Sequence, residues 1–464
     1  MTETVANKRA PVGRAPSRAA GIGLAVVSVT ALFFIWAFVT NLIDPLVKSM
    51  KVIYTLTDFE AQLNQFAFFI AYGVMSIPAA GYLARKGYAS SIVLGLLGII
   101  AGCIVAWSTT LSHSFITVLA GLFIAASGIT LLQVAANPLI AAMGDQKGAH
   151  FRLNLCQAFN SLGAYAGGTF GAAFLLKGEL FNKGVVLTDA LKTDGLSFVT
   201  GVYLAIAAAL ALFTAFVFIS RETIAVHAPV TAAHAESPLS ALKSRWANLG
   251  AIAIFLYVGA EVCVISGMIF FLEQKQILDV PSQIAGYITP YFMLLAMIGR
   301  FAGSALLRKF AATGMLTLVA SGASILCLIV ITTYGMAASP LGGAITLGGV
   351  SMPITTGFVP AIAAISLGLF NAIMFPTIFT LTLERSSAPA SATSGLMCMA
   401  ICGGGIISLA FGGVVDLFGH LVPMGARSLA FVVPLICYLY VLWFARAARS
   451  AATHAIDEDM AGGR

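Results

Sequence analysis

The sequence predicts an all-α integral membrane protein in which twelve transmembrane helices form two six-helix bundles. Of its 464 residues, 59% are hydrophobic and only 9% are charged, with a mean hydropathy of +0.96. In a soluble globular domain roughly a quarter of the residues are charged, so this composition excludes one. The other two observations are twelve long apolar runs and one polar stretch that divides them into two sets of six.

The apolar runs determine the expected number of spans. A helix that crosses the hydrocarbon core of a bilayer needs about 20 consecutive, mostly apolar residues. Runs of this kind occupy residues 22–44, 61–84, 89–110, 114–143, 153–177, 197–220, 247–272, 284–307, 313–334, 357–383, 393–418 and 427–445. The first run continues into Asn41-Leu42-Ile43-Asp44-Pro45 with no small-residue cleavage site, so we expect it to be retained as a span.

The polar stretch predicts the domain organisation. It is rich in His, Pro, Ser and Thr and is too polar to span a membrane. We therefore expect a cytoplasmic tail at 1–21, an N-terminal six-helix bundle at 22–220, a cytoplasmic linker at 221–246, a C-terminal six-helix bundle at 247–445 and a cytoplasmic tail at 446–464. Two such halves around a central site are typical of transporters that alternate between two states.

The basic residues predict the orientation, because cytoplasmic loops of bacterial inner-membrane proteins retain Lys and Arg. Seventeen of the 25 Lys and Arg residues fall in the two tails and in loops on the same side, seven fall opposite, and Arg300 lies inside a span. Both termini are therefore expected in the cytoplasm. This asymmetry accounts for the pI near 9.0, and no nucleic acid is expected as a partner.

Enzyme motifs are missing from the chain. There is no nucleotide-binding loop G-x-x-x-x-G-K-[ST], no H-E-x-x-H and no nucleophile elbow between a strand and a helix. An enzyme is therefore not expected, and an ATP-driven pump would need another chain to supply the energy. The seven cysteines lie within or beside apolar runs without metal-type spacing, so neither a metal nor a cofactor is expected.

Two carboxylates in or beside apolar runs are the candidates for proton coupling. A carboxylate near the centre of a spanning helix costs about 2.5–3.5 kcal/mol on insertion scales, so Glu261 must face the bundle interior or a water-filled cavity. Asp44 lies near the outer end of the first run. A helix-terminal acid is the alternative for Asp44, and a structural acid is the alternative for Glu261. All six histidines fall in tails, loops or span edges, which argues against a histidine relay.

Carboxamides inside the runs are the candidates for binding a polar solute. Gln157 and Asn160 are three residues apart, and Gln133 and Asn137 are four apart, so each pair shares a helix face. Asn371 adds an amide beside an aromatic-rich run in the second half. Carboxamides both donate and accept hydrogen bonds, which suits a ligand covered in hydroxyl groups. The alternative is that these amides join neighbouring helices, and for Asn137 this structural role is favoured.

Three glycines and one arginine carry further expectations. Gly163, Gly167 and Gly171 form a stripe of small residues at four-residue spacing, for which close helix packing is the favoured interpretation. Arg300 lies toward the cytoplasmic end of the eighth run, where we expect it to anchor the inner interface. A counter-charge to Glu261 is the alternative role.

Five blocks in order identify a family. They are Phe33-Phe34-Ile35-Trp36-Ala37-Phe38 leading to Asn41-Leu42-Ile43-Asp44, Leu132-Gln133-Val134-Ala135-Ala136-Asn137-Pro138, Arg152-Leu153-Asn154-Leu155-Cys156-Gln157-Ala158-Phe159-Asn160-Ser161-Leu162-Gly163, Tyr257-Val258-Gly259-Ala260-Glu261-Val262, and Phe370-Asn371-Ala372-Ile373-Met374-Phe375-Pro376-Thr377-Ile378-Phe379. From about residue 22 to residue 445 the chain resembles the fucose, galactose and glucose proton-symporter family of the major facilitator superfamily.

The resemblance implies a bacterial inner-membrane sugar importer with two six-helix bundles. It implies that Asp44 carries the proton and that Gln157 and Asn160, with Asn41 nearby, meet sugar hydroxyls. In fucose transporters of the family an acid occupies the position of Gln133, so the chain is more similar to the glucose and galactose branch. The stretch from Pro340 to Pro360, rich in Gly, Thr and Pro, departs from both branches.

We therefore expect proton-coupled import of a neutral monosaccharide, glucose or galactose, by alternating access. The alternatives are symport of L-fucose or an N-acetyl-hexosamine with protons, sodium-coupled symport, and an uncoupled sugar facilitator. The expected partners are the sugar, a proton or a sodium ion, and the lipid bilayer. We expect a monomer.

Overall fold

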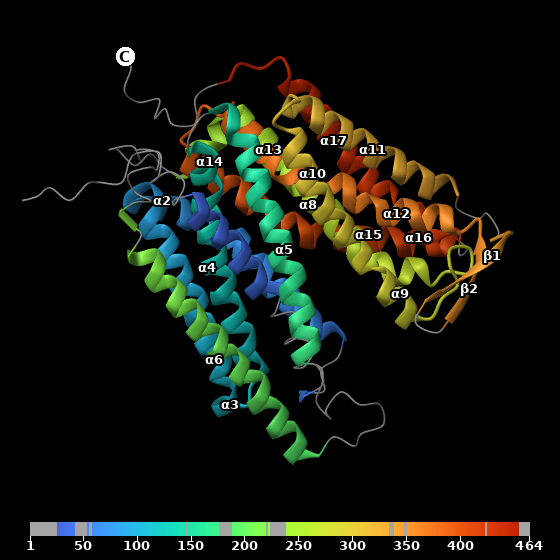
Figure 1. Ribbon diagram of the computed structural model, residues 1–464, viewed down its shortest axis with the longest axis horizontal. Coiled ribbons are helices and arrows are strands. Elements are labelled where there is room, and N and C mark those ends of the chain that lie inside the picture. Colours follow the sequence, from blue (N-terminus) through green and yellow to red (C-terminus); the bar gives the residue numbers. More distant parts are fainter. Residues whose placement is uncertain are drawn as a thin grey trace, which may run out of the picture.

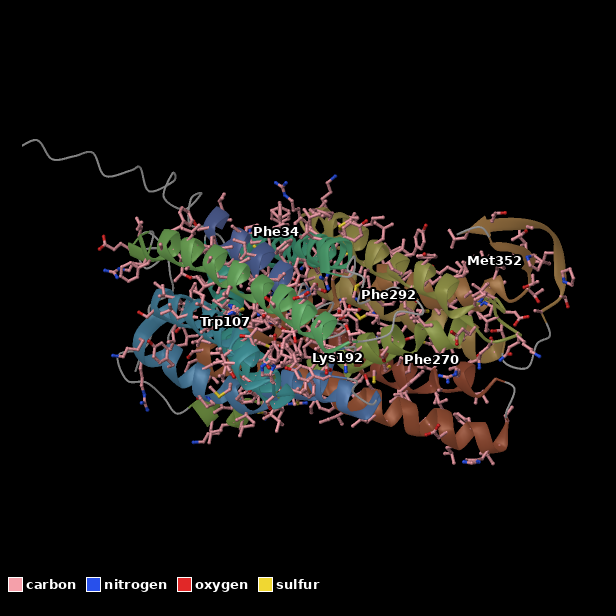
Figure 2. The ribbon with its side chains drawn as sticks, turned by 90° about the horizontal axis from the view of Figure 1, so that it is seen from below. Phe34, Trp107, Lys192, Phe270, Phe292 and Met352 are labelled. Carbon is pink, nitrogen blue, oxygen red and sulfur yellow. The ribbon has the colours of Figure 1, made fainter. Side chains whose placement is uncertain are left out.

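The structure is a computed structural model that describes most of the chain. The described residues are 26–41, 53–54, 58–143, 146–175, 188–219, 221–222, 238–333, 338–347, 350–422 and 425–453. Within them the regular secondary structure is helical except for one hairpin, as Figure 1 shows. Large apolar side chains also cover the outside of the helices: Phe270, labelled in Figure 2, is 54% exposed and Leu409 is 80% exposed. Such a surface suits lipid rather than water.

The N-terminal half consists of long helices. They are the helix Val26–Asn41, α2 (Asp58–Trp107), α3 (Thr109–Ser112), α4 (Phe115–Ala142), the 3-10 turn η1 (Gln146–Gly148), α5 (Ala149–Leu175) and α6 (Asp189–Ile219). The expected second and third spans run together in α2, which bends at Gly87. The φ of Gly87 is 79°, a left-handed value that glycine adopts without the penalty a side chain would bring.

The helices of the C-terminal half are shorter and more often interrupted than those of the N-terminal half. Its helices are η3 (Pro238–Lys243), α8 (Arg245–Leu272), α9 (Ser282–Ile288), α10 (Pro290–Leu306), α11 (Ala312–Thr332), α12 (Phe358–Asn371), α13 (Met374–Leu383), α14 (Ala390–Met399), η4 (Ala400–Cys402), α15 (Gly403–Leu421), α16 (Ala426–Leu429) and α17 (Val432–Ala448). The expected tenth span is divided between α12 and α13, and the eleventh between α14, η4 and α15. Each of the twelve expected runs thus coincides with helix, as far as the residues are described.

One feature contradicts the purely helical prediction. Strands β1 (Pro340–Leu347) and β2 (Val350–Thr355) form an antiparallel hairpin at one end of the C-terminal half (Figure 1). The β-branched Ile and Thr residues here favour strands, and Gly342 and Gly343, with φ of 88° and 84°, lie where the register shifts. The hairpin lies in the stretch that departs from both family branches, so the family resemblance did not predict it.

The glycine stripe of α5 packs against the first helix. A Cβ added to Gly163 would overlap the carbonyl oxygen of Phe34, and one added to Gly167 would overlap that of Phe38. The backbones therefore approach too closely for any side chain, as small residues allow between membrane helices. At these two glycines the structure agrees with the packing interpretation. This contact fixes the position of α5, which borders the C-terminal half along its other side through α10 and α13.

Candidate functional site

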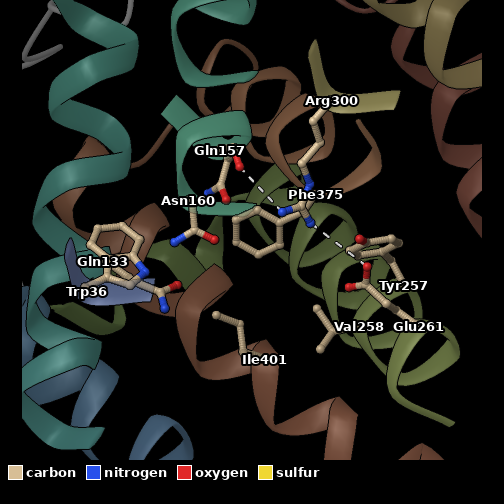
Figure 3. A pocket seen from close by; sticks show the side chains of 10 residues that line it. All are labelled: Trp36, Gln133, Gln157, Asn160, Tyr257, Val258, Glu261, Arg300, Phe375 and Ile401. Atoms are coloured by element: carbon tan, nitrogen blue, oxygen red, sulfur yellow. Dashed lines mark hydrogen bonds and ion pairs between the residues drawn. The ribbon is translucent and has the colours of Figure 1, made fainter. Parts of the chain in front are cut away.

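A cavity of about 160 Å³ lies between the two halves (Figure 3). Four of the ten residues that line it come from the N-terminal half and six from the C-terminal half. They are Trp36, Gln133, Gln157 and Asn160, then Tyr257, Val258, Glu261, Arg300, Phe375 and Ile401. A cavity made by both halves can change shape when the halves move relative to each other, which a transporter requires.

The amides of the N-terminal half differ in how much of their hydrogen-bonding capacity is used. Gln133 Nε2 donates to the hydroxyl of Tyr72 at 2.6 Å, and Asn160 Nδ2 donates to the carbonyl of Phe33 at 3.0 Å. The Gln157 side chain is mostly buried and makes no hydrogen bond to another described residue. A carboxamide has two donors and an acceptor. Gln157 therefore has the most capacity to offer to a ligand.

A charged pair occupies the side of the cavity formed by the C-terminal half. Arg300 Nη2 lies 4.0 Å from Glu261 Oε1, and the two side chains are only 15% and 17% exposed. Glu261 extends from α8, one helical turn beyond Tyr257. Since the pair brings one negative and one positive charge, the cavity has no net charge from its described lining. A neutral ligand fits this balance better than an ion.

Arg300 also joins the halves. Its Nη1 donates to the carbonyl of Gln157 at 3.5 Å and to the hydroxyl of Ser161, both on α5. Its Nε donates to the carbonyl of Ala372 at 3.1 Å. The expectation that Arg300 anchors the inner interface is wrong, because its guanidinium lies in the cavity next to Glu261. The alternative role, a counter-charge, agrees with this geometry.

Aromatic rings provide the flat walls of the cavity. Trp36 packs against Phe33 with ring centroids 4.3 Å apart, and Phe375 packs against Phe379 at 5.9 Å. These contacts hold the two rings in place from opposite halves. Aromatic rings give a large apolar contact area with a defined orientation, so amides and rings together suit a ligand with both hydroxyl groups and apolar faces.

Three of the predicted site residues are described and do not line the cavity. A fourth, Asp44, lies outside the described residues. Asn41 donates from Nδ2 to the carbonyl of Ala37 at 2.9 Å, one turn earlier on its own helix, and is not among the lining residues. Asn137 and Asn371 are fully buried and do not line the cavity either. Of the predicted residues that the structure describes, it therefore brings together Gln133, Gln157, Asn160 and Glu261.

Sequence reasoning did not assign several lining residues to the site. Arg300 was considered as a counter-charge only as an alternative, although a cation within an apolar run is as costly as an acid there and calls for a partner. Trp36, Tyr257, Val258 and Ile401 carried none from composition, since apolar and aromatic residues fill every run. Among the described residues, no three His, Cys, Asp or Glu side chains gather as metal ligands would.

Comparisons with known proteins agree with this architecture. The family model described as Major Facilitator Superfamily matches residues 24–409. The chain is 35% identical over 422 residues to the glucose/galactose transporter of Brucella abortus biovar 1 (strain 9-941), covering 91% of this chain and 93% of that protein. It is 30% identical over 440 residues to the L-fucose-proton symporter of Escherichia coli (strain K12), with 91% and 93% covered.

Solved structures show the same fold. A crystal structure of the transporter FucP in the outward conformation superposes with a TM-score of 0.76 at 27% identity, covering 92% of this chain and 99% of that one. The family match and the relatives both extend over most of the chain, and its long apolar helices agree with them. The chain is therefore a multi-pass integral membrane protein and belongs to the Major Facilitator Superfamily, among the relatives of glucose/galactose transporters and FucP.

Proposed function

We propose that the protein imports a neutral monosaccharide, glucose or galactose, together with protons by alternating access. The observation that carries this proposal is the cavity between the halves, where free amide capacity, two aromatic walls and a balanced charged pair meet. The relatives support the class of substrate, since the first of them is a glucose/galactose transporter. Gln133 supports glucose or galactose over L-fucose, because fucose transporters of the family have an acid at this position.

The side chains that line the cavity would bind a neutral sugar through hydrogen bonds and ring contacts. Gln157 would hydrogen-bond sugar hydroxyls, and Gln133 and Asn160 would do so through the carbonyl oxygens that their present bonds leave free. Trp36 and Phe375 would cover the apolar faces of the sugar ring. Glu261 either binds a hydroxyl directly or shares in the proton-linked step, and Arg300 keeps it paired in either role.

Asp44 is the proposed proton carrier. A deprotonated Asp44 would disfavour the occluded state, because burial of an unpaired carboxylate is costly. Protonation from the outer medium would remove this cost and allow the loaded carrier to close, and release of the proton inside would reset it. The named E. coli relative, a proton symporter, supports this form of coupling.

We infer that the protein resides in a bacterial inner membrane with both termini in the cytoplasm. The support is the distribution of Lys and Arg along the chain, because positively charged loops are retained on the cytoplasmic side. In this orientation the end of the bundle where α4 leads into α5 and α13 leads into α14 faces the cytoplasm.

Uptake into proteoliposomes tests the proposal. Purified protein is reconstituted, and radiolabelled D-glucose or D-galactose uptake is measured with an imposed pH gradient, a sodium gradient or neither. Accumulation is expected with the pH gradient alone and is abolished by a protonophore. Accumulation with sodium alone would favour the sodium-coupled alternative, and equilibration without accumulation in every gradient would favour the facilitator. Competition by L-fucose or N-acetyl-glucosamine that exceeds both hexoses would reassign the sugar.

Asp44→Asn separates coupling from binding. The amide imitates a permanently protonated acid, so this variant is expected to exchange sugar between the two sides in counterflow but not to accumulate it. Full accumulation by Asp44→Asn would exclude Asp44 as the carrier and leave the cavity assignment standing.

A further inference from the structure

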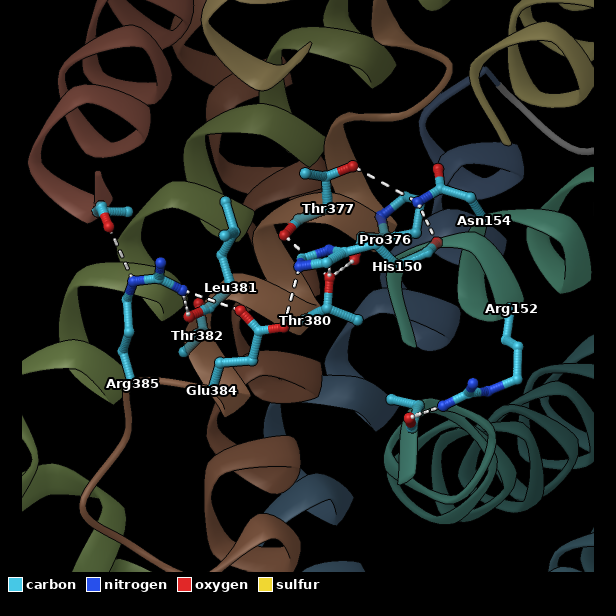
Figure 4. Close-up of polar contacts among 12 residues, drawn as sticks. His150, Arg152, Asn154, Pro376, Thr377, Thr380, Leu381, Thr382, Glu384 and Arg385 are labelled. Atoms are coloured by element: carbon cyan, nitrogen blue, oxygen red, sulfur yellow. Dashed lines mark hydrogen bonds and ion pairs between the residues drawn. The ribbon is translucent and has the colours of Figure 1, made fainter. Parts of the chain in front are cut away.

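The halves are held together at the end of the bundle nearest to the α4–α5 and α13–α14 connections (Figure 4). His150 Nε2 on α5 lies 3.0 Å from Glu384 Oε1 at the end of α13. Asn154, one turn further along α5, donates from Nδ2 to the hydroxyl of Thr377 at 3.5 Å. Ser394 on α14 donates to the carbonyl of Val134 on α4 at 2.8 Å. Each of these contacts joins the N-terminal half to the C-terminal half.

The two carboxylate oxygens of Glu384 contact different halves. Oε2 accepts from Arg385 Nη1 at 3.0 Å, and Arg385 is fixed within the C-terminal half by bonds to the carbonyls of Leu381 and Ala448 at 3.1 and 2.9 Å. Oε1 is left for His150. Burial raises the pKa of the Glu384 carboxyl, but His150 and Arg385 outweigh burial and hold this pKa below its ordinary value. The carboxylate is therefore charged throughout the neutral range.

The ring of His150 has a polar partner at both nitrogens. Nε2 faces the Glu384 carboxylate, and Nδ1 contacts the hydroxyl oxygen of Thr380, whose own hydrogen bonds the carbonyl of Pro376 at 2.9 Å. Only the protonated imidazolium donates from both nitrogens. In a neutral ring with Nε2 protonated, Nδ1 accepts, and the Thr380 hydroxyl donates to it instead of to Pro376. A protonated ring would instead donate to both partners and add an ionic attraction to Glu384, so the two forms hold the halves together with different strength.

The other charged groups around the cluster do not supply a second partner. Arg152 of α5 donates to two carbonyl oxygens at the end of α4, Lys147 of η1 is exposed, and Arg308 lies over a phenylalanine ring of α5 at 5.0 Å. Arg300 of α10 is occupied in the cavity, and α4 has no charged residue. Asp145 lies outside the described residues. Within the described part, Glu384 is the carboxylate that the histidine faces.

We propose that His150, Thr380 and Glu384 form a pH-responsive latch that holds this end closed more firmly when His150 is charged. Histidine is the side chain whose charge ordinarily changes between about pH 5 and 8. The physiological consequence rests on the proposed function and orientation: protons that enter with sugar acidify the cytoplasm, strengthen the latch and slow the opening of the carrier inward. Uptake would limit itself before the cytoplasm became strongly acidic.

A distance measurement without sugar tests the latch. Lys147 and Ser387 are exposed on opposite halves beside the cluster. Spin labels are attached through Lys147→Cys and Ser387→Cys after replacement of the seven native cysteines, all of them free thiols, and the label distances are recorded from about pH 8 to about pH 5.5. As the pH falls, the ratio of the short-distance to the long-distance population is expected to rise about tenfold. A nearby opposite charge shifts a protonation equilibrium by about this factor or more.

Three variants decide the outcome. His150→Gln keeps a hydrogen-bonding side chain without a titratable charge and is expected to abolish the pH response. His420→Gln, an exposed histidine at the end of α15, is the matched control and should leave the response unchanged. If His150→Gln does not fold, Glu384→Gln must abolish the response instead. Distances that do not change with pH in the parent protein, or a full response in His150→Gln, would overturn the latch whatever the substrate proves to be.

A pH change on one side of the membrane then tests the consequence for transport. In proteoliposomes of known orientation, acid on the side of this end alone is expected to slow sugar exchange several-fold in the parent protein and to have less effect in His150→Gln. Equal slowing of both proteins would overturn the latch as a regulator. Absence of sugar transport in every condition would instead contradict the proposed function, since the distances are measured without sugar.

Discussion

Helix α5 meets the C-terminal half at two places whose polar contacts differ. At the latch, His150 and Glu384 are 3.0 Å apart and their hydrogen-bonding groups are used. At the cavity, Arg300 reaches the Gln157 carbonyl at 3.5 Å and Glu261 at 4.0 Å, and the Gln157 side chain keeps its capacity. Seven residues of helix, about 10 Å, separate the two places. One region holds the halves together, and the other leaves polar groups available to a ligand.

The largest expected effect is at the charged pair of the cavity. Arg300→Ala would leave the mostly buried Glu261 carboxylate without its partner, and removal of one member of a buried pair costs roughly 3–5 kcal/mol. We expect a marked loss of thermal stability and of sugar binding. Arg300→Lys, which keeps the charge but not the planar fork, should recover part of both. Wild-type stability and binding in Arg300→Ala would show that this pair is not needed.

The next effect separates two amides of α5. Gln157→Ala should weaken hexose binding by about 1–3 kcal/mol, because ligand hydroxyls would be left unpaired in a desolvated site. Asn160→Ala should also lower thermal stability, because Asn160 Nδ2 holds the Phe33 carbonyl. Calorimetric titration and thermal unfolding are measured on both variants. Normal binding by both, with altered stability only, would assign these amides to helix packing.

The close packing of α5 against the first helix is expected to make thermal stability similarly sensitive to an added methyl group. Gly163→Ala places a methyl group against the Phe34 carbonyl, and overpacking of this kind costs about 1–3 kcal/mol. The matched control is Gly201→Ala on α6, where a Cβ would meet nothing within 4 Å. Thermal unfolding should show a loss in Gly163→Ala and none in the control. Equal stability of the two variants would contradict the close approach of α5 to the first helix.

The last expected effect is of similar size near neutral pH and becomes smaller in acid. Because the pKa of Glu384 is held below its ordinary value, its carboxylate stabilises the folded protein above that ordinary value. The contribution is lost as the pH falls through the lowered pKa. Glu384→Gln should therefore be less stable than the parent by about 1–3 kcal/mol near neutral pH, and the difference should shrink in acid. A difference that grows in acid would reverse the assigned direction.

The fold was largely predictable from the sequence, because the bilayer imposes a simple requirement on length and polarity. Each apolar run coincides with helix where the chain is described, although the run at 357–383 is divided between α12 and α13. The hairpin at residues 340–355 was not predicted. It lies between spans, where no bilayer constrains the chain and local β-branched residues decide the structure.

The site was predictable only in part. Polar residues inside apolar runs are conspicuous, so Gln133, Gln157, Asn160 and Glu261 could be selected. The same argument also selected Asn137 and Asn371, because polarity alone does not tell a cavity-facing amide from a buried one. The latch could not be found at all in this way. His150 looked like an ordinary residue at a span edge, and only the packing of α5 on α13 brings it to Glu384.

Binding of sugars to the purified protein tests the central claim most directly. D-glucose, D-galactose and L-fucose are titrated into the parent protein and into Gln157→Ala. The cavity account predicts that a hexose binds more tightly than L-fucose, whose C6 lacks a hydroxyl, since a site built to bond a hydroxyl discriminates strongly against its absence. It also predicts that Gln157→Ala weakens this binding. Strongest binding of L-fucose with no competition from either hexose would contradict the substrate, and hexose binding unaffected by Gln157→Ala would contradict the site.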